Sequence, residues 1–404
     1  MKITENLASL IVNRTTKLLG KNINIMDENG LIIGSGDKER IDQFHEGAEK
    51  VISSGDPLEI SHSDAQNLKG VKPGINLPIE FNEQIVGVVG ITGAPDKIRD
   101  YAELVKITAE LMLQQSVLEE EIRLEDRAHD NFIQDLISLD EDDDKEFIKT
   151  RAEILGYNMM ISRVAVVIGI DNFWEFAYHK LNKKEETVDE GIYIQQLKNQ
   201  ILSEIKDLLY QDQQDMISMA GNNNFLVIKS FHAELKAVDK EEYLFDLAAK
   251  IKELLSTKYD LNLTIGIGNY HPGIEGISNS FSEAKQAREI GAKLFGSDDI
   301  YHINELEIGK LLEEVSPATK KWFSKITLGT AQNRDDLDET LVETLDIFFA
   351  NDLNVSQTAR KLYIHRNTLL YRLDKVKDKT NLDPRQFSDA LRLKLALMIR
   401  EYNE

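Results

Sequence analysis

The longest unbroken pattern in the sequence is helical and covers residues 100–139. Apolar residues recur there every three or four positions, which is the spacing of one face of an α-helix. A helix of this length with charged outer positions can join two domains or pair with its copy in a dimer. The alternative is that it packs against the domain that precedes it. Its apolar positions are Leu104, Ile107, Leu111, Val117, Leu118, Ile122, Phe132, Ile133 and Leu136.

Length and charge distribution indicate several domains. A single hydrophobic core stops growing at roughly 250–300 residues, so this chain of 404 residues is expected to form about two to four domains.

The net charge of −22 is unevenly spread. Residues 354–404 hold 11 Lys and Arg against 6 Asp and Glu, or +5, whereas the preceding residues carry −27. The basic end favours nucleic-acid binding, and a solvated basic helix face is the alternative.

The chain has no cysteine, which excludes disulfides, thiolate metal sites and cysteine nucleophiles and suits a reducing compartment. Residues 1–6 begin no apolar run of the kind a secretion signal needs, and no segment approaches membrane-spanning length. We therefore expect a cytoplasmic protein without a membrane partner.

Residues 1–118 combine helices with two hairpin signals. Strand-like residues 23–26 and 31–33 flank the turn sequence DENG, and residues 75–79 and 85–91 flank the polar turn NEQ. These signals predict an antiparallel sheet with flanking helices, a PAS-like layout that is usual for small-molecule sensors.

The remainder divides into a linker and two domains. A helical linker is expected at 119–144, ending in the acidic run 140–144, which is most simply solvated. Residues 145–303 alternate helix and strand and predict an α/β domain. Residues 304–404 lose the strand signals and should be all helical. The expected fold class is therefore multidomain α+β.

A helix-turn-helix pattern lies in the basic end. Asn354 or Ser356 can cap a first helix, in which Ala359 lets a second helix approach closely. A short turn at 363–365 precedes a helix over 366–376 that buries Leu369, Leu373 and Val376. Two amphipathic helices of an ordinary bundle are the alternative. The candidate DNA-binding residues, which include groups suited to base edges and phosphates, are Ser356, Thr358, Arg366, Asn367, Thr368, Tyr371, Arg372 and Lys375.

This segment resembles the helix-turn-helix of the PucR/CdaR group of bacterial regulators. The resemblance extends over residues 354–400 and includes FSDALRL at 387–393, which is similar to the family's closing helix. The matching residues are Asn354, Ser356, Thr358, Ala359, Leu362, His365, Arg366, Asn367, Thr368, Leu369, Tyr371, Arg372 and Leu373.

The N-terminal segment resembles the sugar-diacid-recognition branch of the same family. The matching strings are INIMD at 23–27, GSGD at 34–37, RI at 40–41, HEGA at 45–48, GINLP at 74–78 and VVGITG at 88–93. The resemblance covers essentially the whole chain and implies an effector such as galactarate, glucarate, glycerate or a related hydroxy acid.

A polyhydroxy carboxylate needs cationic donors for its carboxylate oxygens and backbone amides for its hydroxyls. Arg40, His45 and Lys72 are the candidate cations, and Gly74 and Asn76 are the candidate backbone positions. A surface ion pair is the alternative for Arg40, and a buried, satisfied histidine is the alternative for His45.

The middle segment resembles the GGDEF domain of diguanylate cyclases in layout but lacks its carboxylates. Gly169-Ile170-Asp171 keeps one acid where an active member has two, and GNNNF at 221–225 stands where the signature hairpin should be. Asparagine cannot replace the carboxylates that hold divalent metal against phosphates. We expect a degenerate GGDEF-like domain with no catalytic residue, no bound metal and no cofactor.

Together these features predict a transcriptional regulator that binds operator DNA, responds to a small carboxylate effector and controls genes for its uptake and catabolism. A homodimer or higher homo-oligomer is expected. The competing classes are an enzyme, for which no Ser/His/Asp order, HExxH, Walker loop or GxGxxG stands out, and an acidic scaffold whose C-terminal helices bind protein.

Overall fold

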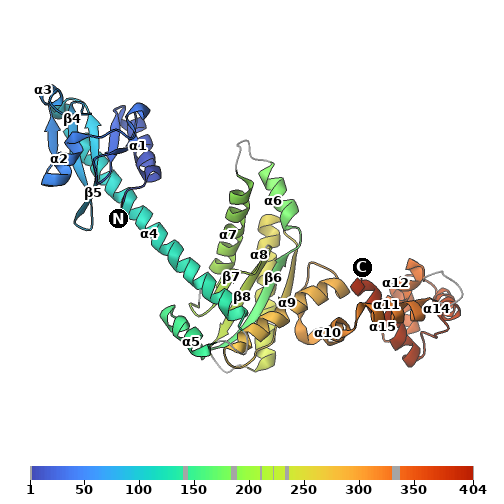
Figure 1. Ribbon diagram of the computed structural model, residues 1–404. Helices are drawn as coiled ribbons and strands as arrows, with labels where there is room; N and C mark the ends of the chain where they lie inside the picture. Colours follow the sequence, from blue (N-terminus) through green and yellow to red (C-terminus); the bar gives the residue numbers. More distant parts are fainter. Residues whose placement is uncertain are drawn as a thin grey trace. The chain divides into compact units, whose positions relative to one another are not determined.

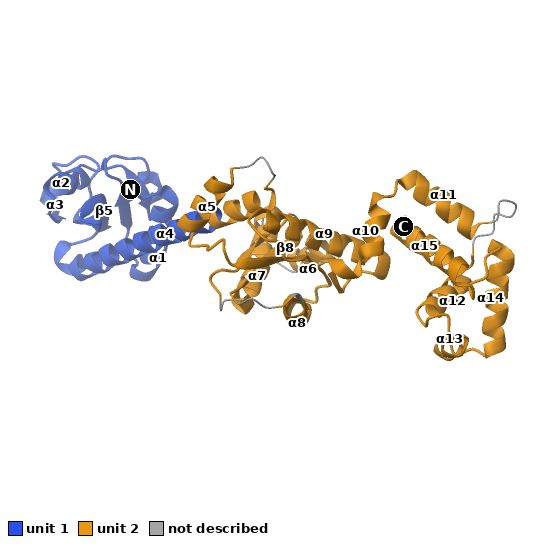
Figure 2. Cartoon of the chain, turned by 90° about the horizontal axis from the view of Figure 1, so that it is seen from below, with its two compact units in different colours: residues 1–127 blue, residues 128–404 orange. Residues whose placement is uncertain are grey.

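The computed structural model describes residues 2–139, 144–182, 189–209, 212–221, 223–232, 236–329 and 337–403. The chain forms two compact units, residues 1–127 and 128–404 (Figure 2). The boundary falls within α4 (Pro95–Ile137), a single helix of 43 residues (Figure 1). The predicted long helix is confirmed, and it begins earlier than expected at Pro95, where the missing N–H of proline costs the first turn nothing.

The first unit is built on a five-stranded antiparallel sheet in the order β2-β1-β5-β4-β3. Both predicted hairpins are confirmed, as β1/β2 and β4/β5. Asn82 and Glu83 connect β4 to β5 with positive φ angles of 50° and 62°, as a two-residue hairpin turn requires. The strands are β1 (Ile23–Met26), β2 (Ile32–Ser35), β3 (Leu58–Ile60), β4 (Gly74–Phe81) and β5 (Gln84–Thr92).

Helices cover both faces of this sheet. Alternate strand residues point to opposite faces, so Ile25 and Val89 pack with α1 and α4, whereas Met26 packs with α2. The side of α4 that meets the sheet contributes Ala102 and Val105 to the core. The helical elements are α1 (Glu5–Leu19), the 3-10 helix η1 (Lys38–Arg40), α2 (Glu46–Ser54), α3 (His62–Ala65) and α4.

The second unit begins with an α/β domain around another five-stranded sheet, in the order β10-β9-β6-β8-β7. The strands β9 and β10 are parallel, and the other neighbours are antiparallel. The strands are β6 (Ser162–Ile170), β7 (Met216–Met219), β8 (Asn224–Phe231), β9 (Leu263–Ile267) and β10 (Ile300–His302). The sequence patterns indicate the three central strands but not the short edge strands β7 and β10.

One face of this sheet packs against α6, α7 and α8, and the other packs against α9 and the C-terminal end of α4. Phe132 and Ile133 of α4 are buried beside Val167 of β6, so α4 contributes to the cores of both units. The helices are α5 (Lys145–Ile154), α6 (Phe173–Leu181), α7 (Glu190–Leu209), α8 (Ala237–Tyr259) and α9 (Glu275–Phe295).

The rest of the second unit is helical in its described residues, as expected. Met398 and Ile399 of α15 pack against Ile290 and Leu294 of α9, which joins the C-terminal helices to the α/β domain. The elements are η2 (Ile303–Glu305), α10 (Glu307–Glu314), α11 (Pro317–Leu328), α12 (Glu339–Phe349), α13 (Val355–Lys361), α14 (Arg366–Thr380) and α15 (Phe387–Asn403).

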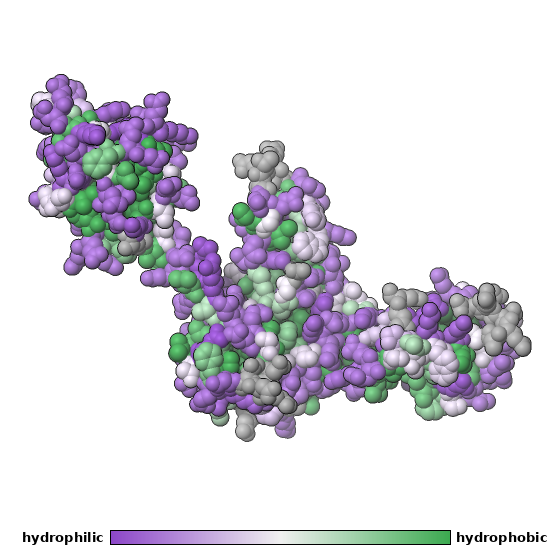
Figure 3. Space-filling model, in the orientation of Figure 1, coloured by the Kyte–Doolittle hydropathy of each residue, from purple (hydrophilic) through white to green (hydrophobic). Residues whose placement is uncertain are grey.

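The visible surface is largely hydrophilic, with apolar residues interspersed (Figure 3). Among the helices of the described residues, none combines the length and apolar character needed to cross a bilayer.

Candidate functional site

Arg40 is the most unusual charged residue of the first unit. It ends the short helix η1, and its side chain is buried, with only 6% of the residue exposed. Its Nη2 donates a hydrogen bond to the carbonyl oxygen of Gly70 at 2.6 Å. Its Nη1 is buried and has no hydrogen-bond partner among the described residues. A buried cationic N–H without an acceptor costs stability, so this atom is suited to an acceptor supplied by a ligand.

His45 lies close to Arg40 and is also buried. It is the N-cap of α2, and its Nδ1 accepts a hydrogen bond from the backbone N–H of Ala48 at 3.1 Å. Burial, together with the positive charge of Arg40, lowers the pKa of His45 to about 4. The imidazole is therefore neutral at pH 7 and carries its proton on Nε2, which is a donor. The sequence-based view of His45 as a cation is wrong for neutral pH.

Asn76 joins the same cluster from the sheet. It is buried in β4, and its side chain packs closely against two glycines. A Cβ atom at Gly47 would lie 3.0 Å from Nδ2 of Asn76 and 3.1 Å from Cε1 of His45. A Cβ atom at Gly90 would lie 2.6 Å from Oδ1 of Asn76. Gly47 and Gly90 occur in the family strings, but only the tertiary structure shows that they border this site.

Lys72 and Gly74 have different environments from this cluster. The side chain of Lys72 is 52% exposed and forms an ion pair with Asp37 at 3.3 Å. Gly74 is buried at the start of β4, where a Cβ atom would lie 2.1 Å from the carbonyl oxygen of Ile91. Close strand packing therefore explains the glycine at 74. The structure brings together Arg40, His45 and Asn76 and leaves Lys72 at the surface.

The predicted helix-turn-helix is present as α13 and α14. Asn354 caps α13 by accepting hydrogen bonds from the N–H groups of Ser356 and Gln357, and Nδ1 of His365 caps α14 by accepting from Asn367. The turn between the helices contains Tyr363 at a φ of 54°. The predicted apolar stripe is confirmed, because Leu369, Leu373 and Val376 are fully buried.

The exposed side of this motif is the candidate nucleic-acid interface. Its exposed positions are Ser356, Arg366, Asn367, Thr368, Tyr371 and Lys375 of the predicted set. Sequence reasoning did not include Arg360, Lys361 and Tyr363, which are also exposed, Tyr363 to 96%. Their positions in the sequence could have identified them, because they lie at the end of α13 and in the turn just before the N-terminus of α14.

Three members of the predicted set have partners within the protein. Thr358 is buried, and its hydroxyl donates to the carbonyl oxygen of Asn354 at 2.8 Å, so the expectation that it faces DNA is wrong. Arg372 is half-buried and donates from Nη1 to the Thr344 hydroxyl of α12 at 3.0 Å. Lys375 is exposed but pairs with Asp338 at 3.3 Å.

In the α/β domain, a cation lies where a metal-binding carboxylate would be needed. A Cβ atom at Gly169 would lie 2.3 Å from Nη1 of Arg288, which comes from α9. The side chain of Asp171 accepts a hydrogen bond from the buried hydroxyl of Thr264 at 2.6 Å. Asn223 donates to the carbonyl oxygen of Ile170 at 2.8 Å, and Asn222 lies outside the described residues. Within the described residues, no group of acidic and histidine side chains could hold a metal ion.

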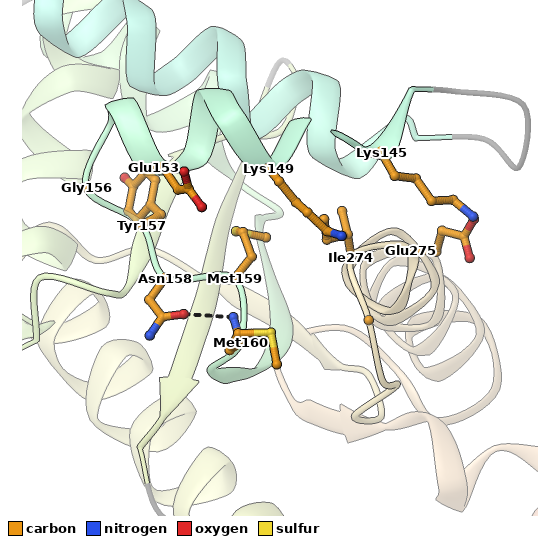
Figure 4. A pocket seen from close by; sticks show the side chains of 11 residues that line it. Lys145, Lys149, Glu153, Gly156, Tyr157, Asn158, Met159, Met160, Ile274 and Glu275 are labelled. Carbon is orange, nitrogen blue, oxygen red and sulfur yellow. Dashed lines mark hydrogen bonds and ion pairs between the residues drawn. The ribbon is translucent and has the colours of Figure 1, made fainter. Parts of the chain in front are cut away.

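A cavity of about 750 Å³ opens between α5, residues 156–160 and the start of α9 (Figure 4). Met159, Met160 and Ile274 supply apolar side chains, and the ion pair between Lys145 and Glu275 lies at one end. No candidate residue from the sequence analysis lines this cavity.

Comparison with known families finds matches to three parts of the chain. A family model for sugar diacid recognition matches residues 3–136, a GGDEF-like domain matches 140–290, and a PucR C-terminal helix-turn-helix domain matches 341–399. The structures found are less similar. A regulator of polyketide synthase expression from Bifidobacterium adolescentis is 14% identical, with a TM-score of 0.32 over 69% of this chain and 93% of that chain.

Several relatives are regulators by name. The purine catabolism regulatory protein of Bacillus subtilis is 26% identical over 36% of this chain and 28% of its own length. The carbohydrate diacid regulator of Escherichia coli is 30% identical over 98% of this chain and 97% of its own length. With three matching domains and a relative that aligns from end to end, this chain belongs to the carbohydrate diacid regulator family of DNA-binding transcription regulators.

Proposed function

We propose that this regulator binds a small hydroxy carboxylate in its first unit and thereby controls genes for the uptake and catabolism of that acid. The effector is a sugar diacid, such as galactarate or glucarate, or a glycerate-like acid. In this proposal a PAS-like sensor at 1–118 is followed by a linker at 119–144, a GGDEF-like domain at 145–303 and a DNA-binding domain at 304–404. The protein acts in the cytoplasm as a homodimer or higher homo-oligomer.

The observation that carries the proposal is the buried Nη1 of Arg40, which has no partner among the described residues. Arginine stays protonated in proteins, so its unpaired N–H can be satisfied only by an acceptor. A carboxylate oxygen is the strongest acceptor available to it. The N-terminus of the nearby helix α2 adds positive potential, which also favours an anion.

The neighbours of Arg40 suit the hydroxyl groups of such an acid. Neutral His45 offers an Nε2–H donor, and the amide of Asn76 offers both a donor and an acceptor. The side chain of Asn76 packs closely against Gly47 and Gly90, which holds its amide in place. The name of the Escherichia coli relative, a carbohydrate diacid regulator, supports the same chemical class.

For DNA binding, we propose that the N-terminal end of α14 enters the major groove. Arg366 and Asn367 are exposed there and have the geometry for bidentate contacts to guanine and adenine. Lys375 forms an ion pair with Asp338, and Arg372 donates a hydrogen bond to Thr344. Lys375 and Arg372 therefore help to hold α14 in position.

We also propose that the GGDEF-like domain has no cyclase activity. The guanidinium of Arg288 against Gly169 would repel a divalent metal, and the carboxylate of Asp171 is engaged by Thr264.

Replacing Arg40 should weaken effector binding. A hydrogen bond from a charged donor contributes about 1.5–3 kcal/mol, so Arg40→Ala should raise the dissociation constant by about one to two orders of magnitude. Calorimetric titration of the full chain with galactarate, glucarate and glycerate measures this. Lys149→Ala, in the cavity of the second unit, is the matched control. Loss of binding in Lys149→Ala but not in Arg40→Ala would move the site to the α/β domain.

The low pKa of His45 should make the first unit acid-sensitive. The unfolded chain binds a proton at His45 near pH 6.5 and the folded chain only near pH 4, so the free energy of unfolding falls as the pH drops through this window. His45→Asn keeps an N-cap acceptor but cannot titrate, and should remove up to about 3 kcal/mol of this pH dependence.

Urea denaturation at several values between pH 7 and pH 4 gives the comparison for His45. His365→Asn is the control, since His365 caps α14 through the same atom but is exposed. An unchanged pH dependence in His45→Asn would show that this histidine is not held neutral in the folded state.

Arg366→Ala should reduce operator affinity by roughly 1–3 kcal/mol if Arg366 contacts a base edge. Fluorescence anisotropy with operator DNA, at fixed salt, measures the loss. Lys321→Ala, an exposed cation of α11, should change affinity far less. Equal affinities for Arg366→Ala and the unsubstituted protein, with the circular dichroism spectrum preserved, would remove Arg366 from the interface.

Incubation of the full chain with GTP and Mg²⁺ or Mn²⁺ should produce no cyclic dinucleotide, because the carboxylates that such catalysis requires are absent at Gly169 and Asn223. Product analysis by liquid chromatography checks this against a sample without protein. Cyclic product that disappears in Asp171→Ala would establish activity and contradict the proposal.

A further inference from the structure

The helix α4 carries a row of exposed apolar side chains in the first unit. Six large residues, each between 47% and 59% exposed, follow one side of the helix. Isolated exposed apolar residues are ordinary, but a periodic row of them along three heptads of a helix is not. We call this row the α4 seam, and its members are Tyr101, Leu104, Ile107, Leu111, Leu118 and Ile122.

The α4 seam is not used by the core of the first unit. The residues of α4 that pack against the sheet are Ile98, Ala102, Val105, Ala109 and Leu113. Successive residues of a helix are rotated by about 100°, which places this buried row on nearly the opposite side from the seam. The helix is therefore apolar on two sides, and only one of them has a partner in its own unit.

The spacing of the α4 seam is that of a two-stranded coiled coil. Leu104, Leu111 and Leu118 recur every seven residues, which assigns them to heptad position d. Position a then falls at Tyr101, Thr108, Gln115 and Ile122. The next d position is Glu125, so the apolar seam ends after Ile122.

We propose that the α4 seam binds the α4 seam of a second copy of this chain, in a parallel two-stranded coiled coil. The pairing follows from residues of the first unit alone. The proposal rests on the homo-oligomer proposed above and specifies its contact surface and the orientation of the two helices. It does not depend on the effector or on DNA.

The polar residues at position a decide the orientation. Within one copy Thr108 donates to the carbonyl oxygen of Leu104 and Gln115 donates to Glu119. In a parallel pair Thr108 also faces Thr108 and Gln115 faces Gln115 of the second copy, so the remaining polar atoms lie beside polar atoms. An antiparallel pair opposes position a with position d, which would place the amide of Gln115 against a leucine. Burying the oxygen and the second N–H of this amide against a leucine would leave them without partners, which is costly, and the parallel arrangement avoids it.

The flanking positions and the area agree with this arrangement. In a parallel pair Ile107 lies beside Met112 of the second copy, and Gln114 lies beside Glu119, so neither contact joins like charges. Like charges meet only in the next pair, Glu121 with Asp126, where the apolar seam ends. Full burial of one such apolar side chain removes on the order of 100 Å², so twelve half-exposed ones supply about 600 Å². With an ordinary polar rim the interface reaches about 1,000 Å², the lower limit for a specific one.

The first experiment measures self-association of the full chain by sedimentation equilibrium, without effector or DNA. Leu111→Glu places a charge in the centre of the seam and should raise the dimer dissociation constant by about 100-fold or more. Leu18→Glu is the matched control, because Leu18 is 78% exposed on α1 and lies outside the seam. A monomeric unsubstituted chain, or equal association in Leu111→Glu, would overturn the proposal.

The second experiment determines the relative orientation of the two α4 helices. It also tests the seam with substitutions that introduce no charge, so a folding defect in Leu111→Glu does not decide the outcome. The natural chain contains no cysteine, so each variant carries a single one. Leu111→Cys should form a covalent dimer on mild oxidation, because a parallel pair brings each position d close to its copy. Glu120→Cys, on the outer side of the helix, should not. Equal cross-linking of both variants, or cross-linking only between Tyr101→Cys (position a) and Leu118→Cys (position d) in a mixture, would reject the parallel seam. Both experiments are carried out without effector, so a failure of the proposed effector site would change neither the sedimentation result nor the cross-linking result.

Discussion

The helix α4 is the constraint on which the rest of the structure depends. A single run of backbone hydrogen bonds extends from Pro95 to Ile137, and its side chains enter the hydrophobic cores of both units. Ala102 and Val105 pack under the first sheet, and Phe132 and Ile133 pack against the second. The same helix therefore supplies core residues to each unit, and neither core is complete without it.

The candidate effector site uses a buried positive charge in an acidic protein. A chain with a net charge of −22 repels anions at its surface, and surface cations such as Lys72 are already paired with carboxylates. The guanidinium of Arg40 lies in a less polar environment, where its interaction with a carboxylate is stronger than in water. The same positive charge helps keep His45 neutral, which turns a potential second cation into a hydrogen-bond donor.

A histidine forms the N-cap of a helix at both the candidate effector site and the candidate DNA interface. His45 caps α2 and His365 caps α14, each by accepting a backbone N–H at Nδ1. His45 is buried beside Arg40, so its cap fixes a group of the candidate effector site. His365 is exposed beside Arg366 and Asn367, so its cap fixes the start of the candidate DNA-contact helix. In both cases the polar side chain that begins the helix also orders the residues next to it.

The sequence by itself determined the elements whose signals are local. Apolar spacing predicted the long helix and the buried row of Leu369, Leu373 and Val376, and turn residues predicted both hairpins of the first sheet. The family strings indicated Arg40, His45 and Asn76, which the structure brings together. Only the tertiary structure decided that Thr358 is buried, that Arg372 contacts Thr344, and that Arg288 crosses Gly169. These outcomes depend on residues from other elements, and the periodicity of one helix or strand carries no information about which distant side chain packs against it.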